Sequence, residues 1–178
     1  MTAFDEISAM TLQMPVQLRI AQHEDIPKLE WFGQYRHYRN LFRVAYREQL
    51  KGGRLILIAA LHEFPIGHIF IQLKSGNTRI ADGVQRAYFY SFRVMEMFRG
   101  EGLGSRLVQE AECLIIDRGY RYATIAVAKN NDGALRLYRR LGYQIFASDP
   151  GQWSYVDHRG VKRFVDEPCW LLEKQVTD

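Results

Sequence analysis

The amino-acid sequence predicts an α/β fold built around one mixed, mostly antiparallel β-sheet with helices on both faces. Short β-rich runs alternate with helical patterns along the 178 residues. In the first half, two strand-like runs follow each other directly, which predicts an antiparallel hairpin. In the middle of the chain, a strand, a helix and another strand follow in turn, which predicts one parallel crossover.

The N-terminal half predicts one strand, two helices and then the hairpin. "VQLRIA" alternates as a strand, and the helical spacing after it is interrupted near Gly33 and ended by Gly52 and Gly53. "HEFP" joins the two strand-like runs of the hairpin, and a polar loop follows. The expected elements are a strand at 16–21, two helices within 23–53, and strands at 54–61 and 66–74.

The C-terminal half predicts a strand, a helix, a strand and a second helix, followed by further strands. Gly119 stops the first of these helices, and Asn130 or Asn131 caps the second, which ends at Gly142. A turn is expected at 157–160. The expected elements are a strand at 87–94, a helix at 102–118, a strand at 123–128, a helix from 130 or 131 to 142, and two or three strands within 144–174.

Length and composition favour a single globular domain over 1–178, with an N-terminal extension at 1–15. No apolar run approaches the roughly 20 residues of a membrane span, and the N-terminus lacks a signal-peptide pattern, so we expect a cytoplasmic protein. The net charge of +4 does not favour nucleic acid as a partner. Neither the two cysteines, Cys113 and Cys169, nor the five histidines have metal-ligand spacing, so no metal is expected.

A glycine-rich turn, "RGEGLGS", lies between the strand at 87–94 and the helix at 102–118. The first N–H groups of a helix have no partner within it and lie at the positive end of its dipole, which favours phosphate. Glycine at 100, 102 and 104 lets a diphosphate approach the backbone, and Arg99 and Arg106 add positive charge. The alternative is a tight turn that needs glycine only for folding.

Two common phosphate motifs do not fit this turn. The dinucleotide pattern G-x-G-x-x-G requires glycine where Ser105 stands, and the Walker pattern requires Gly-Lys-Ser/Thr, which is absent.

The turn and a second segment together resemble the GNAT superfamily of N-acetyltransferases. "RGEGLG" fits the family signature R-x-x-G-x-G at Arg99, Gly102 and Gly104. "FRVMEMFRG" is similar to the family's preceding strand end, although Glu96 stands where many members have proline. Downstream, "NNDGALRLYRRLGY" resembles the second family motif at Asn131, Ala134, Leu137, Tyr138, Gly142 and Tyr143. The strong resemblance covers residues 54–145.

The resemblance implies acetyl-CoA as cosubstrate, with its pyrophosphate on the backbone of residues 100–105. It also implies that the strands at 87–94 and 123–128 diverge and that pantetheine lies between them. The Val94 N–H would then stabilise the oxyanion that forms on the thioester carbonyl. The implied cofactor-binding residues are Phe92, Arg93, Val94, Arg99, Gly100, Glu101, Gly102, Leu103, Gly104, Ser105, Asn131, Ala134 and Tyr138.

Tyr138 is the predicted general acid, because a phenol can protonate the departing CoA thiolate and stay protonated at neutral pH. The alternative is a core aromatic on a helix face. The general base is less defined, and the candidates are Tyr88, Tyr90 and His68, each of which could instead be a packing residue. In a regular strand Tyr88 and Tyr90 share one face with Phe92 and Val94, and a bulge would change this assignment.

By resemblance, the first two helices and the C-terminal strands line the acceptor site. Arginines at 36, 39, 43 and 47 share one predicted helix face, and they either attract an acidic acceptor or form a solvated face. Trp153, Tyr155 and Trp170 are either core residues or cleft walls.

Three functions follow from these observations. The first is transfer of acetyl from acetyl-CoA to a primary amine of a small molecule or peptide, by direct attack in a ternary complex. The second is a catalytically silent acetyl-CoA sensor or scaffold, and the third is a nucleotide-binding protein of another fold. The resemblance also allows a homodimer through the C-terminal strands.

Overall fold

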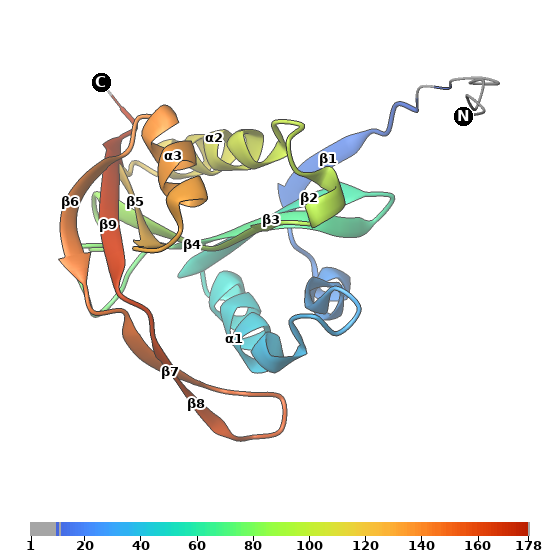
Figure 1. Ribbon diagram of the computed structural model, residues 1–178, viewed down its shortest axis with the longest axis horizontal. Helices are drawn as coiled ribbons and strands as arrows, with labels where there is room; N and C mark the ends of the chain where they lie inside the picture. The colour runs from blue at the N-terminus through green and yellow to red at the C-terminus, as the bar shows by residue number, and fades with distance from the viewer. Residues whose placement is uncertain (1–9, 11, 178) are drawn as a thin grey trace, which may run out of the picture.

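A seven-stranded sheet runs through the middle of the protein and has helices on both of its faces (Figure 1). The computed structural model describes residue 10 and residues 12–177, so most of the predicted extension at 1–15 lies outside the described residues. Across the sheet the strands are β1 (Val16–Ile20), β2 (Arg54–Leu61), β3 (Phe64–Gln72), β4 (Arg86–Val94), β5 (Tyr122–Ala128), β9 (Cys169–Gln175) and β6 (Gln144–Asp149).

The sheet is mixed, as predicted from the sequence. β4 and β5 are parallel, and all the other neighbouring pairs of the sheet are antiparallel. The parallel pair is connected through α2 (Leu103–Ile116), which is the predicted crossover helix.

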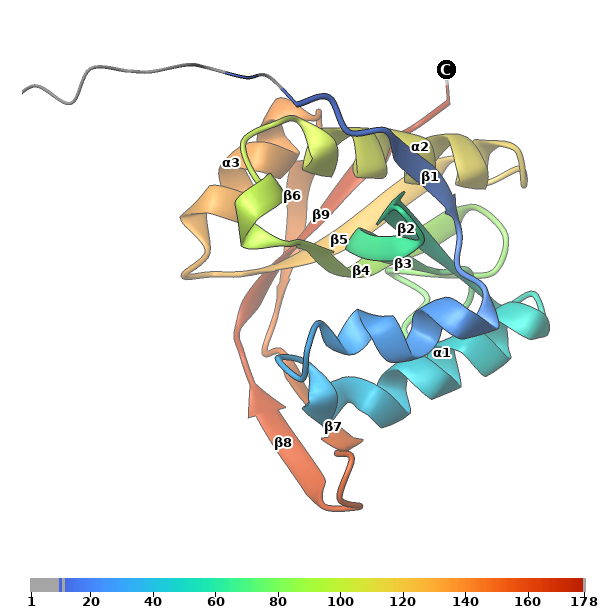
Figure 2. The same cartoon turned by 90° about the vertical axis from the view of Figure 1, so that its right-hand side faces the viewer.

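The helices form two layers, one on each side of the sheet (Figure 2). α2 and α3 (Asp132–Arg140) cover one face, which we call the α2 face. α1 (Arg39–Leu50) covers the other, which we call the α1 face, together with the 3-10 helices η1 (His23–Glu30) and η2 (Arg36–Tyr38). A short 3-10 helix, η3 (Glu96–Phe98), follows β4.

The first predicted helix is a 3-10 helix, so its expected α-helical form is wrong. Pro27 lies inside η1, and proline removes a backbone donor that an α-helix needs. η1 ends where Trp31 and Phe32 take positive φ angles of 41° and 57°, just before Gly33.

The C-terminal region has four strands, one more than the two or three that the sequence predicts. β7 (Gln152–Val156) and β8 (Lys162–Asp166) form a separate hairpin that extends on the α1 side of the sheet (Figure 2). Its turn lies at the predicted position, where the Asp157 carboxylate accepts N–H groups from Arg159 and Val161 at 2.9 and 3.0 Å.

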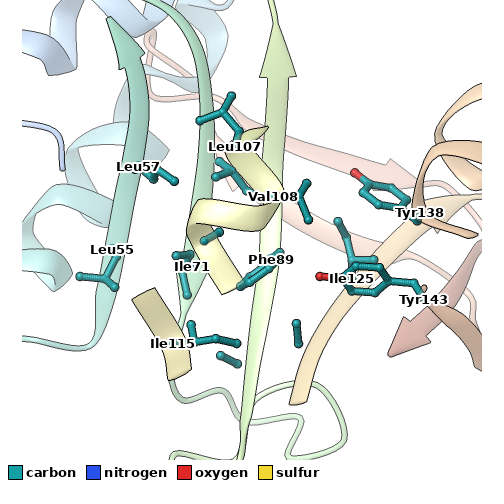
Figure 3. Packing of buried hydrophobic residues seen from close by; sticks show 14 of the residues in the cluster. Leu55, Leu57, Ile71, Phe89, Leu107, Val108, Ile115, Ile125, Tyr138 and Tyr143 are labelled. Carbon is teal, nitrogen blue, oxygen red and sulfur yellow. The ribbon is translucent and has the colours of Figure 1, made fainter. Parts of the chain in front are cut away.

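Both faces of the sheet are apolar because helices bury both. In β2, Leu55 and Leu57 belong to the core under α2, while Ile56 and Ile58 belong to the core under α1. This explains why β2 appears in the sequence as a continuous apolar run. Figure 3 shows the α2 face, where α2 side chains pack over β3 and β4. Complete burial of each such side chain stabilises the fold by roughly 1.5–3 kcal/mol.

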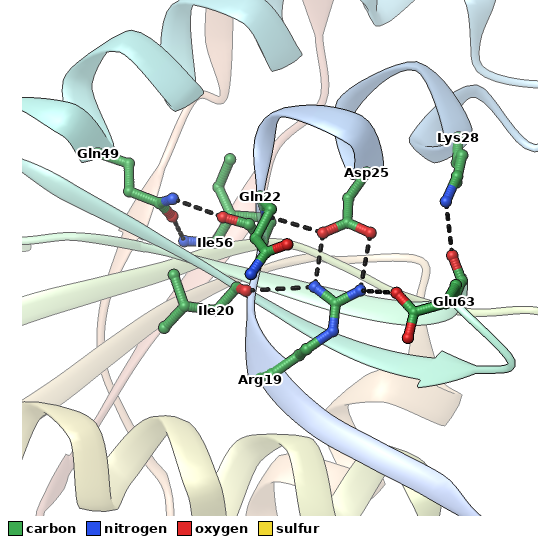
Figure 4. Close-up of polar contacts among 9 residues, drawn as sticks. Arg19, Ile20, Gln22, Asp25, Lys28, Gln49, Ile56 and Glu63 are labelled. Atoms are coloured by element: carbon green, nitrogen blue, oxygen red, sulfur yellow. Dashed lines mark hydrogen bonds and ion pairs between the residues drawn. The ribbon is translucent and has the colours of Figure 1, made fainter.

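A polar network fixes η1 and α1 against the sheet (Figure 4). Asp25 accepts two hydrogen bonds from the Arg19 guanidinium, at 2.6 and 3.0 Å, and one from the Gln22 N–H at 2.7 Å. Burial alone would raise the pKa of Asp25, but these hydrogen bonds hold it below its ordinary value. Gln49 of α1 bonds the Ala21 carbonyl and the Ile56 N–H.

A β-bulge at Ser91 divides β4 into two parts that face differently. Ser91 has φ 48°, and the pairing with β3 shifts between His68 and Phe70. Tyr90 therefore packs at the α1-face core, whereas Phe92 and Val94 pack at the α2-face core. The expected sharing of one face by Tyr88, Tyr90, Phe92 and Val94 is wrong, because the extra residue reverses the alternation.

None of the described helices is long and apolar enough to cross a membrane.

Candidate active site

The loop between η3 and α2 presents a row of unpaired backbone donors. No acceptor among the described residues takes a hydrogen bond from the N–H groups of residues 100–105, and the first helical bond runs from Arg106 to the Gly102 carbonyl at 3.0 Å. Gly100 and Gly102 have φ 85° and 78°, and a Cβ on either would meet no atom within 4 Å. The loop therefore combines free donors, open space and a helix N-terminus, which fits a diphosphate.

Arg99 connects this loop to the end of β4. Its Nε donates to the Val94 carbonyl at 2.9 Å, and the residue is otherwise exposed. One function of Arg99 is thus structural, and its remaining N–H groups are free to face an anion near the loop.

β4 and β5 separate beyond their first four residue pairs. Pairing joins Arg86–Phe89 to Tyr122–Ile125 and then stops. The bulge at Ser91 turns β4 away, so Ala126–Ala128 have no strand partner on that edge and pair only with β9. The Met95 N–H bonds the Ile66 carbonyl of β3 at 2.8 Å. Because successive strand N–H groups point to opposite edges, the Val94 N–H points into the gap.

A cleft of about 910 Å³ joins this gap to the glycine loop. Its size is within the usual range of small-molecule sites. Most of the predicted cofactor-binding residues line it. The cleft is lined by Tyr90, Ser91, Phe92, Arg93, Val94, Arg99, Gly100, Gly102, Gly104, Ser105, Ile125, Ala126, Val127, Ala128, Asn131, Gly133, Ala134, Leu137, Tyr138, Arg140 and Glu167.

Tyr138 stands in the wall of this cleft. Its side chain is buried, with the ring 6.2 Å from the Phe92 ring and 5.9 Å from the Tyr143 ring. Burial, with a smaller contribution from the phenol of Tyr88, raises the pKa of Tyr138, so the phenol is protonated at neutral pH. At the start of α3, Asn131 Oδ1 accepts the Ala134 N–H at 3.0 Å, which confirms its predicted capping role.

Residues 18–143 match the sequence model of the acetyltransferase (GNAT) family. The chain belongs to this family. The match begins earlier in the chain than the motif resemblance and contains both motifs.

Solved structures with the same fold include several other acetyltransferases. Three of them are an N-acetyltransferase from Staphylococcus aureus, NAA60 from Arabidopsis thaliana in complex with acetyl-CoA, and the ribosomal-protein-S18-alanine N-acetyltransferase from Escherichia coli. They are 14%, 18% and 15% identical to this chain, with TM-scores of 0.69, 0.66 and 0.69. The matches cover 92%, 90% and 92% of this chain and 99%, 98% and 96% of theirs.

Within this GNAT fold, the three candidate bases lie in different surroundings. His68 is 0% exposed, packs against the rings of Trp31, Phe42 and Phe70, and does not line the cleft. Burial and the nearby Arg93 charge lower the pKa of His68 to about 3. His68 therefore has the surroundings of a neutral core residue.

Tyr88 and Tyr90 are stacked on the α1 face, with ring centroids 5.6 Å apart. Tyr90 lines the cleft, and its hydroxyl accepts a hydrogen bond from Arg54 Nη1 at 2.5 Å. Burial raises the pKa of both phenols, so both hold their protons at neutral pH. Either phenol would therefore need a partner or a bound water to accept a proton.

Three charged side chains of the GNAT cleft, those of Arg93, Arg140 and Glu167, were not predicted as functional. Arg93 was expected to contribute only its main chain. Glu167 lies between β8 and β9, so the hairpin brings it to the cleft from a distant part of the chain. No local pattern in the sequence indicates this placement.

The predicted face of four arginines is not uniform in the structure. Arg39 forms an ion pair with Glu30, at 2.5 Å between Nε and Oε1, whereas no ion pair is found for Arg36, Arg43 or Arg47 within the described residues. Tyr155 packs against Tyr38 at 5.0 Å between ring centroids, so the hairpin packs against η2.

Proposed function

We propose that the protein transfers the acetyl group of acetyl-CoA to a primary amine of a small molecule or peptide, by direct attack in a ternary complex. One observation carries the proposal: the free N–H row of residues 100–105 continues into the unpaired edges of β4 and β5. A phosphate-bearing group and an extended amide-containing arm would satisfy both sets of backbone groups.

The chain's own residues would hold the cosubstrate as follows. Gly100, Gly102 and Gly104, with their neighbours in the loop, supply donors to the diphosphate. The main chain of Phe92, Arg93 and Val94 pairs with the pantetheine arm, and Asn131 and Ala134 contact it from α3. Acetyl-CoA supplies the acetyl group as a thioester.

Two groups of the chain act on the reacting atoms. The Val94 N–H donates to the thioester carbonyl oxygen as negative charge develops there. This hydrogen bond lowers the activation free energy by about 3 kcal/mol. Tyr138 gives its proton to the sulfur as the C–S bond breaks and the C–N bond of the amide forms. It regains a proton from the acceptor nitrogen. Tyr88 and Tyr90 stay proposed bases, and of the two Tyr90 alone lines the cleft. The burial of His68 argues against a role of His68 as the base.

Release of free thiol from acetyl-CoA over a panel of primary amines tests this function. We expect turnover with at least one amine and its loss in Tyr138→Phe, with Tyr122→Phe as a matched control on β5. A thermal shift with acetyl-CoA that exceeds the shifts with ATP and NAD would support the binding site. Binding without turnover of any amine would instead favour the silent sensor or scaffold, and no binding would contradict both.

Three further expectations from the sequence stay predictions. They are a single domain over 1–178, a cytoplasmic location and a homodimer through the C-terminal strands. Both cysteines are free thiols, which supports a reducing compartment. Light scattering on the purified protein measures the oligomeric state.

A further inference from the structure

Because of the bulge at Ser91, the Arg93 side chain lies on the α1 face, and Arg93 is one of the residues that line the cleft. Its guanidinium carbon lies 4.5 Å from the centroid of the Tyr35 ring and 5.2 Å from that of the Tyr38 ring. Nη1 donates to Ser91 Oγ at 2.6 Å. The rings and this hydrogen bond hold the guanidinium in one place at the cleft wall.

This cation has no anionic partner among the residues that the structure describes. Three other partly buried arginines are paired with carboxylates: Arg19 with Asp25, Arg39 with Glu30, and Arg86 with Glu173. A fourth, Arg54, donates to the Tyr90 hydroxyl instead. Arg93 has phenols, the Ser91 hydroxyl, His37 and His68 around it, and burial lowers its pKa. Since a guanidinium has five N–H donors, most of those of Arg93 are free for a ligand in the cleft.

One carboxylate, that of Glu167, lines the same cleft within the described part of the chain. The Arg93 guanidinium lies 5.2 Å from the centroid of the Tyr38 ring. Burial raises the pKa of Tyr38, the Arg93 charge lowers it, and Tyr155 and Glu167 raise it. Arg93 and Glu167 do not form an ion pair with each other. The cleft therefore holds Arg93 and Glu167 as a cation and an anion that are not paired with each other, and Arg99 and Arg140 also line it.

We infer that the acceptor is an aminocarboxylate, whose carboxylate binds Arg93 and whose ammonium faces Glu167. This inference rests on the proposed acetyl transfer and names its substrate class. A planar carboxylate matches the guanidinium fork, which can form two parallel hydrogen bonds. A phosphate dianion fits less well, because one of its two charges would face Glu167 without a cation.

Glu167 also has the chemistry to prepare the amine. An ammonium must lose one proton before its nitrogen can attack, and a carboxylate facing it accepts that proton directly or through one water. The proton then leaves to solvent, because Glu167 is exposed.

Matched acceptors that differ in a single carboxylate test the inference. The probes are tyrosine against tyramine, phenylalanine against phenethylamine, and a Ser-Asp against a Ser-Asn N-terminal peptide. Phosphoethanolamine against ethanolamine tests phosphate. We expect kcat/KM to be about 10- to 100-fold higher for the member of each pair that carries the carboxylate. A hydrogen bond between charged groups gives a difference of about this size. The amino-acid and peptide pairs distinguish a free acceptor from an acidic peptide.

Variants then assign the effect to residues. Arg93→Gln should abolish the preference by raising KM for the carboxylate member, with KM for acetyl-CoA unchanged, and Arg93→Lys should restore part of it. Arg121→Gln, which changes an exposed arginine directly before β5, is the control. Glu167→Gln should lower kcat/KM at least 10-fold for every amine, while its exposed neighbour in Asp166→Asn should have no effect.

The outcomes separate the two proposals. Turnover of amines with equal kcat/KM within each carboxylate pair overturns the inference and leaves the proposed function intact, as does a preference for phosphoethanolamine. A preference that survives Arg93→Gln also overturns it. If acetyl-CoA binds and no amine is acetylated, the proposed function fails and the inference fails with it.

Discussion

Replacing Gly151 with alanine should destabilise the protein and displace Glu167. Gly151 lies between β6 and β7 with φ 66°, and its carbonyl accepts the Glu167 N–H at 3.1 Å. An alanine Cβ there would overlap the Glu167 carbonyl oxygen and stand 2.5 Å from the carbonyl carbon. The positive φ costs about 1–2 kcal/mol, and relieving the overlap with backbone costs about 1–3 kcal/mol more. The free energy of unfolding should therefore fall by about 2–5 kcal/mol.

Gly160→Ala is the matched control for this substitution. Gly160 has φ 81° in the turn of the hairpin, and a Cβ there would meet no atom within 4 Å. It should lose only the cost of the positive φ, about 1–2 kcal/mol. Guanidinium denaturation measures both losses, and kcat/KM should fall in Gly151→Ala alone. Equal free-energy losses in the two variants would refute the packing argument.

Three other predictions concern the acid, the loop and a buried histidine. Tyr138→Phe should lower kcat by about 100-fold in steady-state assays with little change in KM for acetyl-CoA; unchanged kcat would remove Tyr138 as the acid. Gly102→Ala should weaken acetyl-CoA binding at least 10-fold, as measured by calorimetry, because the added methyl group enters the open space above the loop. Unaltered binding would contradict the proposed diphosphate site at residues 100–105. His68 has a pKa of about 3 in the folded state and about 6.5 unfolded, so the unfolded state binds the proton first as pH falls. Because of this residue, urea denaturation should give a free energy of unfolding about 2 kcal/mol lower at pH 5 than at pH 7. The His68→Leu variant should not show this part of the pH dependence, and an equal pH dependence in both proteins would contradict the lowered pKa of His68.

The sequence was most informative where local chemistry decides the structure. The run 54–61 is a strand with the predicted ends, because both faces of β2 are buried and its residues are β-branched or apolar. The glycine loop and the cap at Asn131 likewise depend on backbone requirements that particular residue types satisfy.

Pairing between distant segments is what the sequence could not show. Tyr88, Tyr90, Phe92 and Val94 alternate regularly, and only the register against β3 reveals the bulge at Ser91. The extra residue in the bulge at Ser91 is what places the Arg93 side chain on the α1 face. The position of Glu167 depends on the β7–β8 hairpin folding back toward the start of α1, where Asn40 Nδ2 donates to the Asp157 carbonyl at 2.7 Å.

The separation of β4 from β5 also divides the sheet mechanically. One half of the sheet consists of β1–β4, and the other consists of β5, β9 and β6. The two halves are joined through strand pairing at four residue pairs between β4 and β5. α2 packs on the first half, where it carries the loop donors, and α3 follows directly from β5 of the second. A ligand that spans residues 100–105 and Asn131 therefore bridges the two halves and replaces the missing hydrogen bonds between them. Its binding should slow amide exchange at Ala126–Ala128 and couple the width of the cleft to cosubstrate occupancy.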